Sequence, residues 1–240
     1  TLLGSLRSDT ILVSCMLVNN ELGTLQPIKE ISHGLKLLKN DVILHTDAVQ
    51  AFKKVPFSVN DLGADLVSIS GHKIGAPRGI GALWIKSGTK INPLTFGGGQ
   101  ESGLCPGTES VPLIAAFAKA SMARMPLDYI NGLCDKAVSM LSEVPGLKII
   151  SRGDAPIINF AIPGYKSETM LNYLSARGIY VSAGSACGKG KPSHVLTALD
   201  LDRELIEGSL RISFNSSNSI DEIAILRDVL CQAVAELAHV

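Results

Sequence analysis

The segment Ser70-Gly71-His72-Lys73 places a lysine directly after a short apolar run, Leu66 to Ile69. Such a run predicts a buried strand, so the amine would lie where the strand ends in a turn of small residues. Partial burial disfavours the charged ammonium and leaves the neutral, nucleophilic amine that a Schiff base requires. A surface lysine after a strand is the alternative, and these residues alone do not decide between the two.

A carboxylate follows an earlier apolar run in the same way. Asp47, in Asp47-Ala48-Val49-Gln50, comes after the run Val42 to Leu44. Ligands of a parallel α/β sheet lie beyond the carboxyl ends of its strands, which is where both Asp47 and Lys73 fall. A carboxylate in that place can pair with the ring nitrogen of pyridoxal phosphate. Together the two motifs are far more specific than either one.

Three motifs occur in order along the chain: His45-Thr46-Asp47-Ala48-Val49-Gln50, Ser70-Gly71-His72-Lys73 and Gly184-Ser185-Ala186-Cys187. With them the chain resembles the cysteine desulfurases, pyridoxal-phosphate enzymes of the class V aminotransferase group. The resemblance extends from about Thr10 to about Leu230, and the family's N-terminal third has no counterpart in it. We therefore expect a parallel sheet with an uncovered edge or face.

The resemblance implies a role for each candidate site residue. Lys73 would carry the cofactor and move the substrate's α-proton, and Cys187 would take the sulfur of L-cysteine as a persulfide, leaving alanine. Asp47 would keep the ring nitrogen protonated. Gln50 would contact the ring hydroxyl, and Ser70 and His72 would contact the phosphate. Asn20 would contact the cofactor or the substrate, and Arg211 would contact the substrate carboxylate. Thr108 would contact the phosphate of the partner subunit's cofactor, which implies a homodimer.

Several of these residues have simpler readings. Cys187 is followed by Lys189 and Lys191, which favour the thiolate, but a free cysteine is often an inert core residue. Arg211 stands between apolar neighbours on an expected strand and could be a surface arginine. Ser70 and His72 could cap their turn, Asn19 could only form a turn, and the glycine-rich stretch before Thr108 could be a flexible connection. In that stretch Cys105-Pro106 departs from the family pattern.

The reading that we adopt is a cysteine desulfurase that supplies sulfur to iron–sulfur cluster assembly or another transfer pathway through a sulfur-acceptor protein. Another class V enzyme, a selenocysteine lyase or an aminotransferase, is the nearest alternative. A truncated, non-catalytic remnant that no longer binds the cofactor is an alternative of a different kind.

The amino-acid composition limits which kinds of partner, metal and cellular compartment we expect. The 22 basic and 22 acidic residues cancel, so net charge favours neither nucleic acid nor an anionic membrane. Apolar runs such as Ile11 to Val18 are too short to cross a bilayer. The five cysteines form no C-x-x-C pair and the histidines have no metal spacing. We expect no metal, and a reducing, cytoplasmic compartment.

The element pattern predicts an α/β fold with two domains. Residues 1–124 would be the remaining part of the cofactor-binding large domain, a mostly parallel sheet with flanking helices, and residues 125–240 a smaller α+β domain with the cysteine loop. Gly81 to Ile85 follows Lys73 too closely for a parallel crossover, so it should be antiparallel or at an edge. In the smaller domain the expected strands are Leu147–Ile150, Ile157–Ala161, Ile179–Val181 and Leu210–Phe214, and the last helix, Ile220–Val234, should begin with a Ser219–Glu222 capping box.

Overall fold

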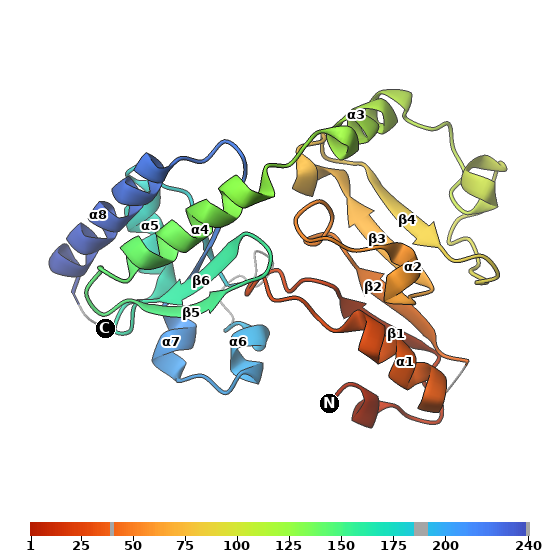
Figure 1. Ribbon diagram of the computed structural model, residues 1–240, viewed down its shortest axis with the longest axis horizontal. Helices are drawn as coiled ribbons and strands as arrows, with labels where there is room; N and C mark the ends of the chain where they lie inside the picture. Colours follow the sequence, from red (N-terminus) through yellow and green to blue (C-terminus); the bar gives the residue numbers. More distant parts are fainter. Residues whose placement is uncertain (39–40, 185–191, 239–240) are drawn as a thin grey trace. The chain divides into compact units, whose positions relative to one another are not determined.

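The chain forms two units, which Figure 1 colours from red to blue along the sequence. The computed structural model describes residues 1–38, 41–184 and 192–238. The first unit comprises Thr1–Val18 and Gln26–Arg124, and the second comprises Asn19–Leu25 and Met125–Val240. Residues 19–25 thus pack with the second unit although most of the first unit follows them in sequence. Within the described ranges, no helix has the length and apolar character needed to span a bilayer.

The first unit contains a four-stranded sheet in the order β1-β2-β3-β4. Strands β1 (Leu12–Met16), β2 (Ile43–Asp47) and β3 (Leu66–Ser70) run parallel to one another. Strand β4 (Gly81–Ile85) is antiparallel to β3 and lies at the edge, which confirms the prediction for this segment. The short connection after β3 leaves no room for the helix that a parallel crossover needs.

Two helices pack side by side in this unit, α1 (Ile28–Leu38) and the short α2 (Val59–Leu62). Helix α1 buries Ile28, Ser32 and Leu35, which the period of a helix brings to one face. The buried Ser32 hydroxyl donates to the carbonyl oxygen of Gly63 at 2.8 Å, so the two helices are joined by a hydrogen bond as well as by packing.

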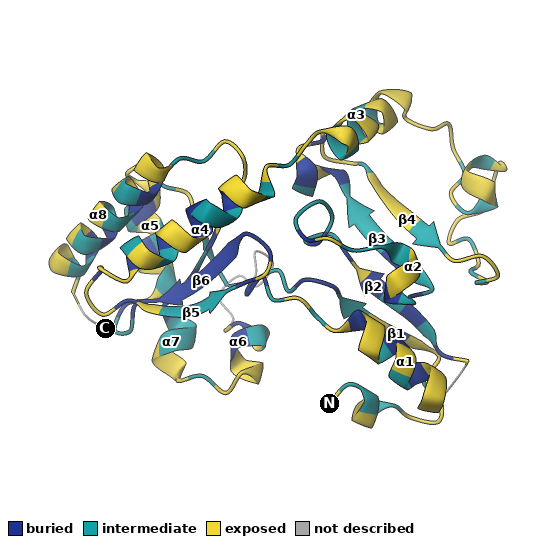
Figure 2. Ribbon diagram, viewed as in Figure 1, coloured by how far each residue is buried: buried dark blue, intermediate teal, exposed yellow. Residues whose placement is uncertain are grey.

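Helix α3 (Val111–Met122) is apolar along most of its length yet has no fully buried residue, and Figure 2 colours it exposed and intermediate. Its Phe117 ring meets Phe52 edge to face, with the centroids 6.4 Å apart. The Lys53 ammonium donates to the carbonyl oxygens of Ser121 and Ala123 at the end of the helix. A cation at this end complements the helix dipole, so adjacent residues of one loop anchor α3.

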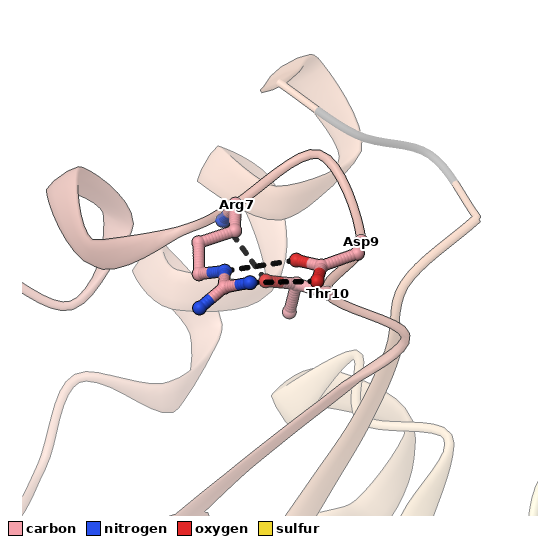
Figure 3. A network of polar contacts seen from close by, with 3 residues as sticks. All are labelled: Arg7, Asp9 and Thr10. Atoms are coloured by element: carbon pink, nitrogen blue, oxygen red, sulfur yellow. Dashed lines mark hydrogen bonds and ion pairs between the residues drawn. The ribbon is translucent and has the colours of Figure 1, made fainter.

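An ion pair organises the turn that precedes β1 (Figure 3). The Arg7 guanidinium donates from Nε to Asp9 Oδ1 at 2.9 Å and from Nη2 to Asp9 Oδ2 at 2.8 Å. The Arg7 amide also donates to Thr10 Oγ1 at 2.9 Å. Both charged side chains are exposed, so the pair adds little stability and mainly defines the shape of the turn.

The second unit contains an antiparallel sheet in the order β5-β6-β8-β7. Its strands are β5 (Lys148–Arg152), β6 (Ile157–Ala161), β8 (Ser209–Ser213) and β7 (Ser182–Ala183). Helices α4 (Leu127–Leu141), α5 (Ser167–Ser175) and α8 (Ile220–Glu236) cover one face (Figure 1), where Ile158, Phe160, Leu210 and Ile212 join the core. Strand β6 is buried along its whole length (Figure 2), so its opposite face is covered too.

Most elements of the second unit match the predicted ones, including β6 residue for residue and the capping box at the start of α8. The strand expected at Ile179–Val181 is wrong, because β7 begins at Ser182. Gly178 adopts a left-handed conformation with φ 76°, and the Ile179 amide donates to Leu174 at the end of α5. These residues therefore terminate a helix instead of pairing. The short helices α6 (His194–Ala198) and α7 (Arg203–Glu207) complete the unit.

Cys134 gives the second unit a measurable pH dependence. Its side chain is 0% exposed on α4, and burial raises the pKa of the thiol from 9.0 to about 11, partly opposed by the charge of Arg152. The unfolded chain loses this proton above pH 9 while the folded chain keeps it. The free energy of unfolding should therefore fall by roughly 2–3 kcal/mol as the pH rises through this window.

The comparison that isolates this thiol is urea unfolding of the protein and of Cys134→Ala, each below pH 9 and near pH 11. The variant has no thiol to ionise at this position, so its stability should fall less over the same range. Equal losses in both proteins would contradict the assignment.

Candidate active site

The carboxyl ends of β2 and β3 bring the predicted cofactor residues of the first unit to one edge of the sheet. The strands are adjacent and parallel, with Asp47 opposite Ser68 in the register. Asp47 is the last residue of β2, and Ser70 is the last residue of β3. Lys73 lies in the 3-10 turn Gly71–Ile74 that directly follows. This is the edge at which parallel α/β sheets bind ligands.

Asp47 is exposed, and its Oδ1 accepts a hydrogen bond from the Val49 amide at 2.8 Å. This bond holds the carboxylate beyond the end of the strand. Two residues earlier on the same strand face, His45 contacts Ser14 Oγ through Nδ1 at 2.8 Å and Ser68 Oγ through Nε2 at 3.1 Å. The sequence motif that contains His45 assigned it no role, and the structure makes it the centre of a polar row across three strands.

The turn after β3 holds Ser70, His72 and Lys73 close together. The Ser70 hydroxyl and His72 Nδ1 are 2.6 Å apart, while His72 is exposed and Lys73 is half-buried. Gly71 has no room for a side chain, because a Cβ there would lie 2.8 Å from Ile80 Cγ2. The small residue therefore lets the turn pack tightly and fixes the position of the lysine.

Gln50 and Thr108 are less closely tied to this edge. Gln50 Oε1 accepts from the Lys54 ammonium at 2.8 Å, which leaves the amide nitrogen to donate elsewhere. Thr108 is exposed in the segment between the 3-10 turn Gln100–Gly103 and α3. Within the described part of the chain, no hydrogen bond joins Thr108 to Asp47 or to the turn that carries Lys73.

This set of side chains fits pyridoxal phosphate. A carboxylate at the end of β2 suits a basic ring nitrogen, and a hydroxyl and an imidazole at the end of β3 suit a phosphate. The primary amine of Lys73 follows them within the same turn and suits an aldehyde. All of these groups belong to one unit and to one edge of one sheet.

In the second unit, a polar row crosses the sheet on the face opposite the helices. Ser151, Asn159, Arg211 and Ser182 are successive partners on β5, β6, β8 and β7. A register shift in β5 between Ile149 and Ser151 brings Ser151 opposite Asn159. A bulge of this kind re-aims a side chain, and here it extends the row to the fourth strand.

Arg211 is half-buried within this row and is not a surface arginine. It donates from Nη1 to the carbonyl oxygen of Asn20 at 2.8 Å and from Nη2 to Ser182 Oγ at 3.2 Å. Burial lowers the pKa of its guanidinium, and the charge of Glu21 opposes that change. The structure thus brings Asn20 and Arg211 together, which their separation in sequence did not indicate.

Asn19 has the turn role that the sequence left open. Its Oδ1 accepts from the amides of Glu21 and Leu22 at 2.9 and 3.0 Å. Cys187, with Lys189 and Lys191, lies outside the described residues. The described cysteines, namely Cys15, Cys105, Cys134 and Cys231, are free thiols, and Cys105 is exposed.

The chain is similar to known proteins in sequence and in fold. The family model described as aminotransferase class-V matches residues 1–226. The cysteine desulfurase IscS of Methanosarcina thermophila is 40% identical, over 98% of this chain and 60% of its own. A solved NifS-like protein superposes with a TM-score of 0.88 at 35% identity, covering 98% of this chain and 64% of that one. SspA, solved in complex with cysteine, has a TM-score of 0.74 at 31% identity, with coverages of 90% and 62%. The chain therefore spans less than two thirds of the length of these relatives.

Proposed function

The chain belongs to the class-V aminotransferase family, and from this premise we propose that the protein is a pyridoxal-phosphate-dependent cysteine desulfurase. It takes sulfur from L-cysteine, leaves L-alanine and carries the sulfur as a persulfide. The observation that carries the proposal is the edge where β2 and β3 end, with Asp47, Ser70, His72 and Lys73 in one unit. The names of the relatives support the choice of substrate, because they are cysteine desulfurases and a protein solved with cysteine.

Pyridoxal phosphate, when bound, supplies an electron sink that stabilises negative charge on the substrate carbons. Lys73 Nζ would hold the aldehyde carbon and would later move the substrate's α-proton. Asp47 would keep the ring nitrogen protonated, because an adjacent carboxylate favours the positive form. Ser70 and His72 would donate to the phosphate, and Gln50 would donate to the ring hydroxyl oxygen through its amide nitrogen.

The remaining residues would act on the substrate. Arg211 would bind the carboxylate of L-cysteine through its planar guanidinium, and Asn20 would lie beside it. The Cys187 thiolate would form an S–S bond to the substrate sulfur while the substrate's Cβ–S bond breaks. The electron pair of that bond stays with carbon, and a proton added there completes alanine. L-cysteine and a thiol thus give L-alanine and a persulfide with no other oxidant or reductant.

The assembly and the pathway are part of the same proposal. Thr108 would reach the phosphate of the cofactor in the partner subunit, which makes the enzyme a homodimer. The proposed enzyme has two domains: residues 1–124 form the cofactor-binding domain, and residues 125–240 form a small domain. The persulfide would pass to a sulfur-acceptor protein for iron–sulfur cluster assembly or another route in a reducing, cytoplasmic compartment.

The test is to incubate the protein, loaded with pyridoxal phosphate, with L-cysteine and dithiothreitol, and to quantify alanine and sulfide. We expect equal amounts of the two, because the reaction breaks one Cβ–S bond for each alanine formed. An enzyme that instead passes the amino group of cysteine to a 2-oxo acid and releases no sulfur is an aminotransferase. A strong preference for selenocysteine over cysteine would identify a lyase for that substrate, and failure to bind the cofactor would identify a non-catalytic remnant.

A further inference from the structure

The segment of residues 19–25 is bound to the polar row of the second unit, because side chains of that row donate to three consecutive carbonyl oxygens of the segment. Arg211 Nη1 donates to Asn20 at 2.8 Å, Asn159 Nδ2 donates to Glu21 at 3.4 Å, and Ser151 Oγ donates to Leu22 at 2.8 Å. Three strands of one sheet thus each contribute one donor. The turn at residues 19–23 is therefore held in a fixed place relative to Arg211.

The side chain of Glu21 points into this same region and is 0% exposed. Its Oε2 accepts a hydrogen bond from Ser193 Oγ at 2.5 Å, and Ser193 in turn caps α6 by accepting from the Leu196 amide at 3.1 Å. Among the buried polar atoms of the described residues, Glu21 Oε1, Arg211 Nε and the neighbouring Asn159 Oδ1 have no hydrogen-bond partner. The negatively charged Glu21 carboxylate can therefore still accept a hydrogen bond, and the positively charged Arg211 guanidinium can still donate one.

The carboxylate of Glu21 affects the electrostatics of Arg211. Burial disfavours the charged guanidinium, and Glu21 is the acidic residue whose charge favours it. A buried cation without a counter-charge is costly, and a flexible arginine relieves that cost by turning its guanidinium toward water. Turning would break both Nη hydrogen bonds, to Asn20 and to Ser182.

We propose that Glu21 is a positioning residue for Arg211: its buried carboxylate is the fixed counter-charge that holds the guanidinium in the orientation in which it binds the carboxylate of an amino-acid substrate. The inference rests on the proposed function, in which Arg211 has that binding role. Glu21 does not touch the substrate and acts only through the arginine. Because a preorganised arginine needs no rearrangement on binding, the effect falls on substrate affinity.

The test compares Glu21→Gln with the protein itself, both loaded with pyridoxal phosphate, by titration of the cofactor absorbance with L-cysteine and with cysteamine. Glutamine keeps the size of the side chain and an acceptor for Ser193 but removes the charge. We expect the Kd for L-cysteine to rise about tenfold, the order of one lost charge-assisted contact. Cysteamine has the amine and the thiol but no carboxylate, so its Kd should stay unchanged. The matched control is Glu168→Gln, on an exposed carboxylate in the first turn of α5, which should change neither Kd.

Two results would overturn the proposal. A lower Kd for L-cysteine would mean that Glu21 competes with the substrate for Arg211, and equal losses for both ligands would mean general damage to the fold. If Glu21→Gln does not fold, Glu21→Asp is tested instead. Its side chain is one methylene shorter, which moves the negative charge away from Arg211. The Kd for L-cysteine should then rise about threefold, and the Kd for cysteamine should not change. All the proteins in this titration also carry Cys187→Ser, which stops sulfur transfer, so binding is read without sulfur release. If binding behaves as expected while the protein with Cys187 releases no sulfur, the proposed function is refuted and this inference is not.

Discussion

Replacing Cys187 by serine is expected to abolish persulfide formation on the protein and to leave the binding of pyridoxal phosphate and L-cysteine intact. A serine hydroxyl is a poor nucleophile toward sulfur, whereas a thiolate is a good one, and the lysines that follow in sequence, Lys189 and Lys191, favour that form. The rate of sulfide release should fall by at least about a hundredfold, as for loss of a nucleophile. Mass spectrometry of the intact protein after incubation with L-cysteine should detect one added sulfur in the parent and none in the variant.

The matched control is Cys105→Ser, because Cys105 is an exposed free thiol in the first unit and would take up sulfur if exposure alone were sufficient. This variant should retain the adduct, and peptide mapping should locate it on the peptide that contains Cys187. Normal alanine production with an unmodified Cys187 would refute the persulfide role. Activity that is unaffected by Cys187→Ser would point to an aminotransferase, and retention of activity on selenocysteine alone would point to the lyase.

Replacing Lys73 by alanine should remove the covalent attachment of pyridoxal phosphate. The amine stands in the turn after β3, and the described structure brings no other lysine into that turn. Reduction with borohydride should add the mass of the cofactor to the parent protein and none to the variant. Turnover of L-cysteine should fall by roughly a thousandfold, because the variant also lacks the general base for the α-proton.

Lys90→Ala provides the control for this experiment, since Lys90 is an exposed lysine of the same unit beyond β4. It should retain both the attachment and the turnover. Borohydride-stable attachment that persists in Lys73→Ala at another lysine would show that the strand-end amine is not the one that binds the cofactor. Because the readout is a mass, the result does not depend on whether the substrate is cysteine.

The placement of the candidate residues in the first unit could be anticipated because the sequence signal for it is local. Asp47 and Lys73 each follow an apolar run, and the two runs are neighbouring parallel strands, as expected for an α/β sheet. The antiparallel β4 followed from the length of one connection. The same reasoning failed at Ile179–Val181, because the Ile179 amide bonds back to the end of α5 and the left-handed Gly178 sets the backbone there.

The site of the second unit could be anticipated only in part. An alternating strand predicts which residues share a face with Arg211, but not whether that face is covered. The cover is the turn at residues 19–23, and it is held by bonds from side chains to backbone carbonyls across long separations. Carbonyl oxygens are present at every residue, so no residue type reveals such contacts. For this reason nothing in the sequence singles out Glu21, although its side chain is fully buried.

The placement of residues 19–25 has a consequence for the order in which the protein folds during synthesis. These residues leave the ribosome before their three donors, because Ser151, Asn159 and Arg211 follow their acceptors by 129, 138 and 191 positions. Contacts of such high sequence separation form slowly, and domains generally fold as their last essential segment emerges. The strands of the first unit are complete by Ile85, so that unit can fold around a segment that still waits for its partners. The sheet of the second unit, by contrast, can be completed only after β8 has been synthesised. Until then the carboxylate of Glu21, which the folded unit buries, is exposed to water.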